Sequence, residues 1–155
     1  MPEIEYRGTF TPEGFAELVR LGRSAIARAI KYTAEDVWGN IGREAPVDSG
    51  RLAGSFQIEQ TEELAWRIYT NVLYALFQQM GTGIYGPVGR PIVPVRARAL
   101  HFYWKATGRS TTLSSVRGTP ANPYVDRAMD KTRPRAPEFA SRAIRETLGA
   151  AGGVS

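Results

Sequence analysis

Three glycines have the spacing of a nucleotide-binding loop. Gly81, Gly83 and Gly86 match G-x-G-x-x-G, which holds the pyrophosphate of a dinucleotide when a strand precedes it and a helix begins directly after it. Three prolines lie between residues 87 and 94. No helix can continue through them, because proline lacks the backbone N–H and its ring clashes with the preceding turn. The sequence therefore predicts a loop here and no bound cofactor.

Very few residues could supply a catalytic base or a metal ligand. His101 is the only histidine, no serine–acid pair or cysteine stands near it, and the chain has no cysteine at all. One histidine cannot form a usual zinc site. The pairs Asp48–Ser49 and Glu62–Glu63 are explained by turn chemistry and by an exposed hairpin tip. We therefore expect no catalytic residues, no metal and no enzymatic activity.

Arginines alternate with aromatic residues between positions 90 and 109. Proteins that bind single-stranded nucleic acid often show this pattern. On a regular strand, however, Arg96 and Arg98 share a face with Leu100, Phe102 and Trp104, which is unlike a stacking platform. A protein–protein interface with arginine and aromatic anchors fits at least as well. The predicted partner-interface residues are Tyr85, Arg90, Arg96, Arg98, Trp104 and Arg109.

The net charge leaves nucleic-acid binding open as an alternative. The formal charge is +5 and comes mainly from arginine, since the only lysines are Lys31, Lys105 and Lys131. Acidic residues between Glu13 and Glu63 are interleaved with the basic ones, whereas a nucleic-acid reader usually gathers its charge on one stripe. The charge is therefore interpreted as a solvated or partner-facing surface.

Length and composition fit one globular unit. A chain of 155 residues with 43% hydrophobic residues can bury one core. The first residues lack the pattern of a signal peptide, and no apolar run reaches the ~18 residues of a membrane span. We therefore expect a soluble chain with no membrane partner. The predicted domain covers residues 1–148, and residues 149–155 are predicted to be a disordered tail.

A long amphipathic helix dominates the first third of the chain. Thr11, Pro12 and Glu13 form a favourable helix start, and Pro46 disfavours helix at the residue before it. The predicted helix runs from about 12 to 44. Its apolar stripe is formed by Phe15, Leu18, Val19, Ile26, Ile30, Val37 and Ile41.

The remaining elements predict an α+β fold with a long N-terminal helix packed on a small antiparallel sheet, followed by C-terminal helices. Alternating apolar residues within 51–71 predict an antiparallel hairpin, whose face of Phe56, Ile58, Trp66 and Ile68 should pack on Phe15, Leu18, Ile26 and Ile30. Further predicted elements are a short helix at 74–80, a loop at 81–94, a strand region from Ile92 to Lys105, a short strand near 113–116, a helix from Tyr124 stopped by Pro134, and a helix at 137–148 ended by Gly149.

Four short motifs in order over residues 45–130 resemble the neck and tail-completion (putative tail-component) proteins of siphophages, similar in role to the lambda minor tail protein Z. They are Ala45-Pro-Val-Asp-Ser-Gly-Arg-Leu52; Tyr74-Ala75 with Gly81-Thr-Gly83; Ile92-x-Pro94 leading into Ala97-x-Ala-Leu-x-Phe102; and Gly118-Thr119 with Asn122-Pro-Tyr124. Two positions depart from the family pattern: Ser49 replaces a threonine, and Gln79 stands where an acid often precedes the glycine turn.

The resemblance implies a virion structural protein that forms a ring, of six copies, at the head–tail junction of a tailed double-stranded DNA phage. Its implied partners are other copies of itself, head connector and stopper proteins, a tail terminator or tail tube protein, and, non-specifically, the passing genomic DNA. The implied location is the virion, and the host cytoplasm during assembly. The resemblance leaves open the alternative of a tail terminator protein proper.

Overall fold

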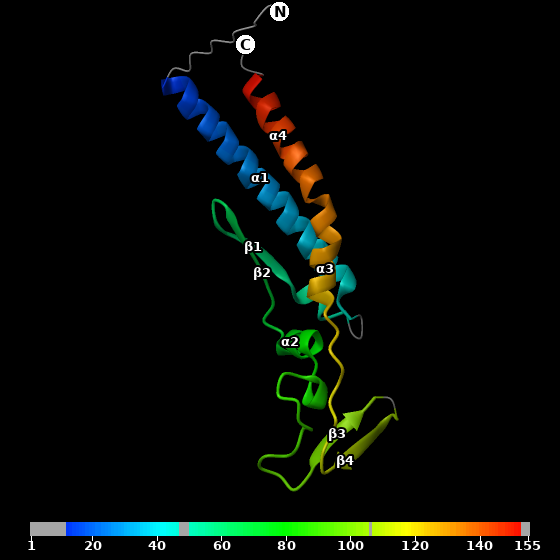
Figure 1. Ribbon diagram of the computed structural model, residues 1–155. Helices are drawn as coiled ribbons and strands as arrows, with labels where there is room; N and C mark the ends of the chain where they lie inside the picture. The colour runs from blue at the N-terminus through cyan, green and yellow to red at the C-terminus, as the bar shows by residue number, and fades with distance from the viewer. Residues whose placement is uncertain (1–11, 47–49, 106, 153–155) are drawn as a thin grey trace, which may run out of the picture.

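The computed structural model describes residues 12–46, 50–105 and 107–152, and its fold is α+β, as predicted. Helices α1 and α4 lie side by side toward one end of an elongated molecule, and the β3–β4 hairpin forms the other end (Figure 1). The short helix α2 lies between these two ends (Figure 1). The molecule thus has a helical body, built mainly of α1, α3 and α4, and a separate β arm that carries β3 and β4 (Figure 1).

Helix α1 spans Pro12–Glu44, which confirms the predicted bounds; its expected cap, Thr11, lies outside the described residues. Only its C-terminal part reaches the small core. Ile41 is 3% exposed and contacts a cluster that joins residues distant in the sequence. The other buried members of this cluster are Ala45, Leu52, Ala75, Tyr124 and Ala128.

The N-terminal half of the α1 stripe is not packed as predicted. Phe15 is 62% exposed, and Leu18 and Ile26 are also exposed. The hairpin lies farther along α1, where Ile30 and Val37 line a hollow with Trp66 and Ile68. The predicted contact of the hairpin with Phe15 and Leu18 is therefore wrong, because the two short strands reach only the middle and C-terminal part of a much longer helix.

The first hairpin consists of β1 (Gln57–Glu62) and β2 (Ala65–Tyr69), antiparallel with Ile58 opposite Ile68. Its turn falls at Glu63–Leu64, and Glu63 forms an ion pair with Arg23 of α1. The alternating apolar residues from Leu52 onward predict a strand, but the first of them do not form one. Ala53–Ser55 is instead the 3-10 turn η1, and Leu52 directly before it is buried in the core.

Helix α2 spans Leu73–Met80 and is followed by η2 (Gly83–Tyr85) in an irregular loop, as predicted. The second hairpin is β3 (Leu100–Trp104) paired with β4 (Arg109–Leu113). Residues 93–99 are not strand; upstream of Leu100 only Ile92 forms a bridge, to Val116. Arg96 and Arg98 therefore have no fixed strand face in common with Leu100, and the predicted short strand at 113–116 lies earlier, at β4.

The last part of the described chain consists of three helical elements that follow one another almost without a break (Figure 1). They are α3 (Tyr124–Thr132), η3 (Arg133–Arg135) and α4 (Ala136–Gly152). Pro134 does not stop the helical path, because it falls in the first turn of η3, where a missing N–H needs no partner. Gly149 does not end the last helix, since one helical glycine costs only about 1 kcal/mol. The predicted tail is therefore helical to Gly152, and residues 153–155 lie outside the described residues.

Polar side chains, rather than the apolar stripe alone, join α1 to α3. Thr132 donates its hydroxyl to Asp36 Oδ2 at 2.8 Å, and Asn40 Nδ2 donates to Thr132 Oγ1 at 2.9 Å. Asn40 and Thr132 are buried, and the guanidinium of Arg135 binds the same Asp36. This buried network is satisfied by its own members, so it fixes how the two helices cross.

Two further carboxylates extend this network along α1. Glu44 accepts from Arg127 Nε at 3.0 Å and from Lys131, and these hydrogen bonds, that of Lys131 first, hold the pKa of its carboxyl below the ordinary value. On α4, Glu146 accepts from the Tyr32 hydroxyl and from Arg142, which lowers its pKa likewise. The residues of α1 that take part recur every four positions, from Tyr32 to Glu44, and so lie along one face.

Candidate assembly surface

A glycine clasp connects the helical body to the β arm. The clasp is formed by residues 81–84 and 117–119: Thr82 N donates to Thr119 O at 2.9 Å, and Ile84 N to Arg117 O at 2.8 Å. Gly83 and Gly118 have φ of 63° and 96°, in the region that favours glycine. A Cβ at Gly83 would lie 2.1 Å from Arg117 O, and one at Gly118 would lie 2.0 Å from Thr82 O. These two glycines are therefore required for the close backbone approach.

Helix α2 is held against the start of α3 by one amide side chain. Gln79 Nε2 donates to Asp126 Oδ2 at 2.8 Å, while Gln79 Oε1 accepts from the backbone N–H of Val125 at 3.1 Å. The Tyr124 hydroxyl donates to the carbonyl of Ala75 at 3.2 Å, and burial raises its pKa. The orientation of α2 is thus fixed, and among the described residues no helix or strand covers its outer face.

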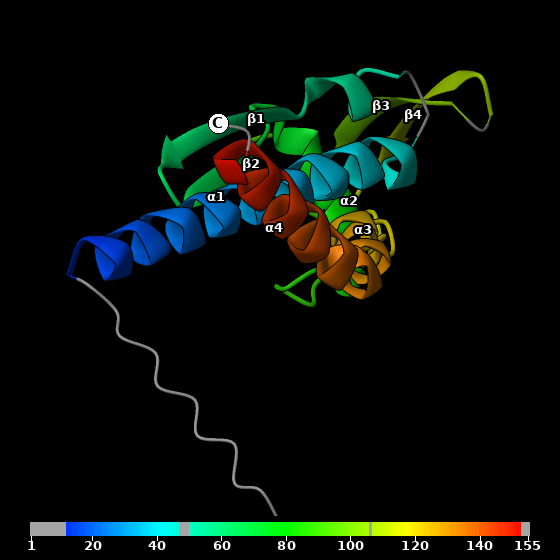
Figure 2. The same ribbon diagram turned by 90° about the horizontal axis from the view of Figure 1, so that it is seen from above.

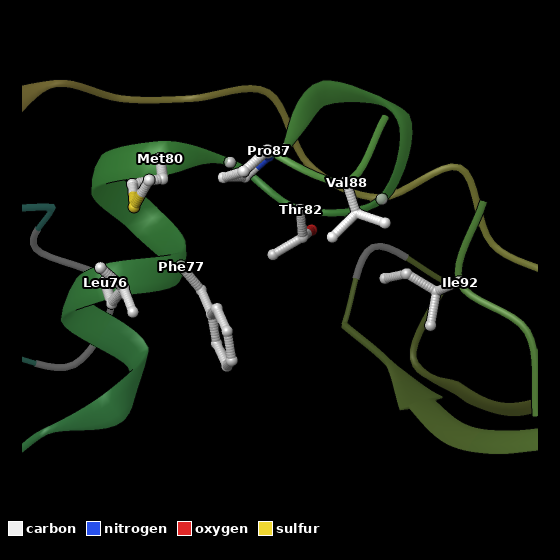
Figure 3. A pocket seen from close by; sticks show the side chains of 10 residues that line it. Leu76, Phe77, Met80, Thr82, Pro87, Val88 and Ile92 are labelled. Carbon is white, nitrogen blue, oxygen red and sulfur yellow. The ribbon is translucent and has the colours of Figure 1, made fainter. Parts of the chain in front are cut away.

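That outer face forms one wall of an apolar trough, shown in Figure 3. Leu76, Phe77 and Met80 of α2 lie opposite Val88 and Ile92 of the loop, and the volume between them is about 530 Å³. Leu76 is 52% exposed and Phe77 45% exposed. The lining carries no charged side chain, so this α2 trough suits an apolar partner surface and offers no group for acid–base chemistry.

The predicted interface residues are all exposed, but they lie on different segments. Tyr85 ends η2 beside the clasp, whereas Trp104 and Arg109 face each other as a cross-strand pair at the tip of the β3–β4 hairpin. Arg90, Arg96 and Arg98 lie on the irregular chain between them. The structure thus places five of the six on the arm formed by residues 86–116, and Tyr85 at its root.

The only histidine of the chain lies on β3. His101 is exposed on β3, with its Nδ1 2.9 Å from the Thr112 hydroxyl across the hairpin. In the part of the chain that the structure describes, no group of three histidine, aspartate or glutamate side chains could hold a metal ion. No described helix is both long enough and apolar enough to cross a bilayer.

No known protein family, curated protein or solved structure matches this chain. The function is therefore inferred from the exposed surface of the protein and from the sequence motifs.

Two features of this surface were missed in the sequence. The residues of α2 were assigned to a helix but not to a site, although Leu73–Met80 carries apolar residues on more than one face and hence cannot bury them all. In addition, the 62 residues 64–125 contain no aspartate or glutamate. The apolar excess of Leu73–Met80 and the lack of acids in residues 64–125 can both be seen in the composition of short segments. Neither can be seen in the average composition of the whole chain.

Proposed function

We propose that this protein is a structural subunit of a ring at the head–tail junction of a tailed double-stranded DNA phage. The observation that carries the proposal is the inverted distribution of apolar side chains. Among the described residues, exposed large apolar side chains outnumber buried apolar residues by 21 to seven. A monomer gains nothing from such a surface, whereas a subunit buries it against its neighbours.

The accessible surface supports an assembly role as well. The exposed apolar residues lie both on α1, at Phe15 and Leu18, and in the α2 trough, at Leu76 and Phe77. Two unlike apolar patches on one chain suit the heterologous contacts that generate rings.

The phage assignment comes from the family resemblance, and the clasp gives two of its motifs a common purpose. Gly81-Thr-Gly83 and Gly118-Thr119 lie far apart in sequence but bind each other backbone to backbone. By the resemblance, the ring has six copies and meets the head connector or stopper below and the tail terminator or tube above.

The decisive experiment is to locate the protein in particles. Tailed particles from the source phage are examined by immunogold electron microscopy with an antibody against this chain, and the purified protein is mixed with the products of neighbouring genes for mass measurement. Label at the head–tail junction, with free heads and tails when the gene is deleted, is the expected result. Label confined to the tail's upper end on detached tails would favour the tail terminator proper, and unlabelled particles would contradict both.

A further inference from the structure

The charge of the molecule is divided between its two ends. Residues 64–125 contain seven arginine and lysine residues and no acid, whereas the remaining residues contain thirteen basic and fifteen acidic ones, so the net charge of +5 splits into +7 and −2. The acid-free segment runs from β2 through α2 and the arm back to α3 (Figure 1). Apart from β2, which packs on α1 and whose Arg67 pairs with Glu59, and the start of α3, this segment makes up the end of the molecule opposite to the outer ends of α1 and α4 (Figure 1). That end is purely basic.

Ion pairing differs between the two ends in the same way. In the helical body, most cations pair with carboxylates, as Arg135 does with Asp36 and Lys131 with Glu44, although Arg43 and Arg145 have no carboxylate partner among the described residues. Five guanidinium groups at the basic end have no carboxylate partner among the described residues, and each of these side chains is exposed. They are Arg90, Arg96, Arg98, Arg109 and Arg117. These charges contribute no ion pair to the fold and remain available to a ligand.

The β3–β4 hairpin adds neutral hydrogen-bonding groups to these cations. Tyr103 is 64% exposed and faces Ser110 across the hairpin, next to the pair of His101 and Thr112. Arginine and hydroxyl side chains are among those that commonly bind phosphate oxygens. A free two-stranded ribbon can also approach a duplex groove. The described part of the hairpin contacts few other elements, and Figure 2 shows it projecting away from the helices.

We propose that the basic end binds the phosphate backbone of duplex DNA without sequence preference, through Arg90, Arg96, Arg98 and Arg109 of the arm and Arg117 beside the clasp. The inference rests on the proposed function, in which the phage genome passes through the ring. A duplex carries one negative charge per about 1.7 Å and repels any carboxylate along its path. A protein partner requires a charge match only at particular contacts. The absence of acids over 62 consecutive residues therefore fits the polyanion.

This assignment separates two roles on one molecule. The α2 trough is lined by apolar side chains and serves protein contacts, whereas the arm carries the unpaired guanidinium groups. If each of the five arginines neutralises one phosphate, the logarithm of the binding constant should fall against the logarithm of the salt concentration with a slope of about −4.5.

The test is fluorescence anisotropy of a labelled duplex of arbitrary sequence with the full-length protein, between about 50 and 200 mM salt. The variant Arg96→Gln/Arg98→Gln/Arg109→Gln should bind more weakly, with a slope less steep by up to about 2.7. The matched control is Arg43→Gln/Arg133→Gln/Arg145→Gln, which removes the same charge from exposed positions of the helical body. It should keep the wild-type slope. Circular dichroism melting verifies that both variants are folded.

Three results would overturn the inference. The first is wild-type protein that shows no salt-dependent binding to the duplex. The second is an equal loss in both triple variants, which would mean that only the overall charge matters. The third is much tighter binding to single strands than to the duplex, lost in Trp104→Ala, which would replace backbone contacts by base stacking.

The binding result and the virion result can be told apart. Solution binding through the arm does not depend on where the protein resides, so its loss in the arm variant supports the site even if particles carry no label. Conversely, the antibody can label the head–tail junction while the arm variant binds the duplex as tightly as the wild type. That result would overturn the DNA-binding site but not the proposed function.

Discussion

Gly83 and Gly89 have the same backbone conformation in different surroundings. Both have φ of 63°, a conformation that costs other residues about 1–2 kcal/mol. A Cβ at Gly83 would lie 2.1 Å from Arg117 O, whereas nothing lies within 4 Å of a Cβ at Gly89. The two positions therefore separate the cost of the backbone conformation from the cost of opening the clasp.

We predict that Gly83→Ala lowers the free energy of unfolding by clearly more than Gly89→Ala, which should cost only the about 1–2 kcal/mol of the left-handed conformation. The excess arises because the backbone of residues 117–118 has to move away from the new methyl group. Urea denaturation of both variants measures the difference. Equal losses would show that the clasp yields at no cost and is not a fixed junction.

Gln79 shows what a motif comparison can and cannot give at the scale of one residue. The resemblance identifies a position where an acid often precedes the glycine turn, and therefore indicates a missing salt bridge. In the structure the amide makes two hydrogen bonds instead, one of them to the carboxylate of Asp126. A glutamate at position 79 would face the like charge of Asp126, so this chain needs a neutral donor there. The contact between Gln79 and Asp126 depends on the position of the first turn of α3, which a motif comparison does not give.

At the scale of the element, α1 was predicted well in extent and only partly in packing. Capping chemistry and the residues around Pro46 determine where a helix can begin and end, so its bounds followed from the sequence. Which part of its stripe is covered depends on the length of the partner elements, and β1 and β2 are too short to reach Phe15. Apolar periodicity alone does not reveal the polar face from Tyr32 to Glu44.

That polar face makes stability depend on pH in a defined direction. The pKa of Glu44 is lowered in the folded protein by Lys131 and Arg127, so its contribution is present above the ordinary carboxyl pKa of about 4.3 and is lost as the pH falls through the lower folded value. We predict that Glu44→Gln is less stable than the wild type at pH 7, and that this difference closes below about pH 4.

Urea midpoints at several pH values measure the effect. Glu138→Gln is the matched control, because Glu138 is exposed on α4 and forms no ion pair with the described residues. It should be about as stable as the wild type at pH 7. A difference for Glu44→Gln that stays constant down to pH 3 would mean that the carboxylate stabilises α1 and α3 by packing rather than by charge.

At the scale of the whole molecule, the α2 trough is the feature that a solitary subunit cannot explain. We predict that Phe77→Asp weakens assembly, because a carboxylate placed in an apolar contact loses its hydration without gaining a partner. Its fold should be unaffected, since Phe77 is 45% exposed. Mass photometry of the protein with its neighbouring gene products measures the loss of ring-sized species.

Met129→Asp is the control, because Met129 is similarly exposed on α3 but lies outside the trough. It should assemble like the wild type. Equal behaviour of the two variants would remove the trough from the assembly interface and leave the exposed stripe of α1 as the remaining apolar contact.

The candidate surface was less predictable than the fold. The arginine and aromatic residues of the arm could be named from their types, and all six predicted residues are exposed. Their spatial grouping could not be predicted, because the chain between Ile92 and Leu100 is irregular and defines no common face. The α2 trough lies between a helix and the irregular loop that follows it, and the path of such a loop is not encoded in any local period.

The clasp also has a topological consequence. The chain leaves the body at Ile84 and returns at Arg117, and these two residues share a backbone hydrogen bond of 2.8 Å. The segment between them is thus a long insertion whose two ends are held side by side. Residues can be added to or removed from the turn between β3 and β4, or the whole insertion exchanged, while both ends stay in register. The reach of the arm can therefore change without any compensating change in the helical body.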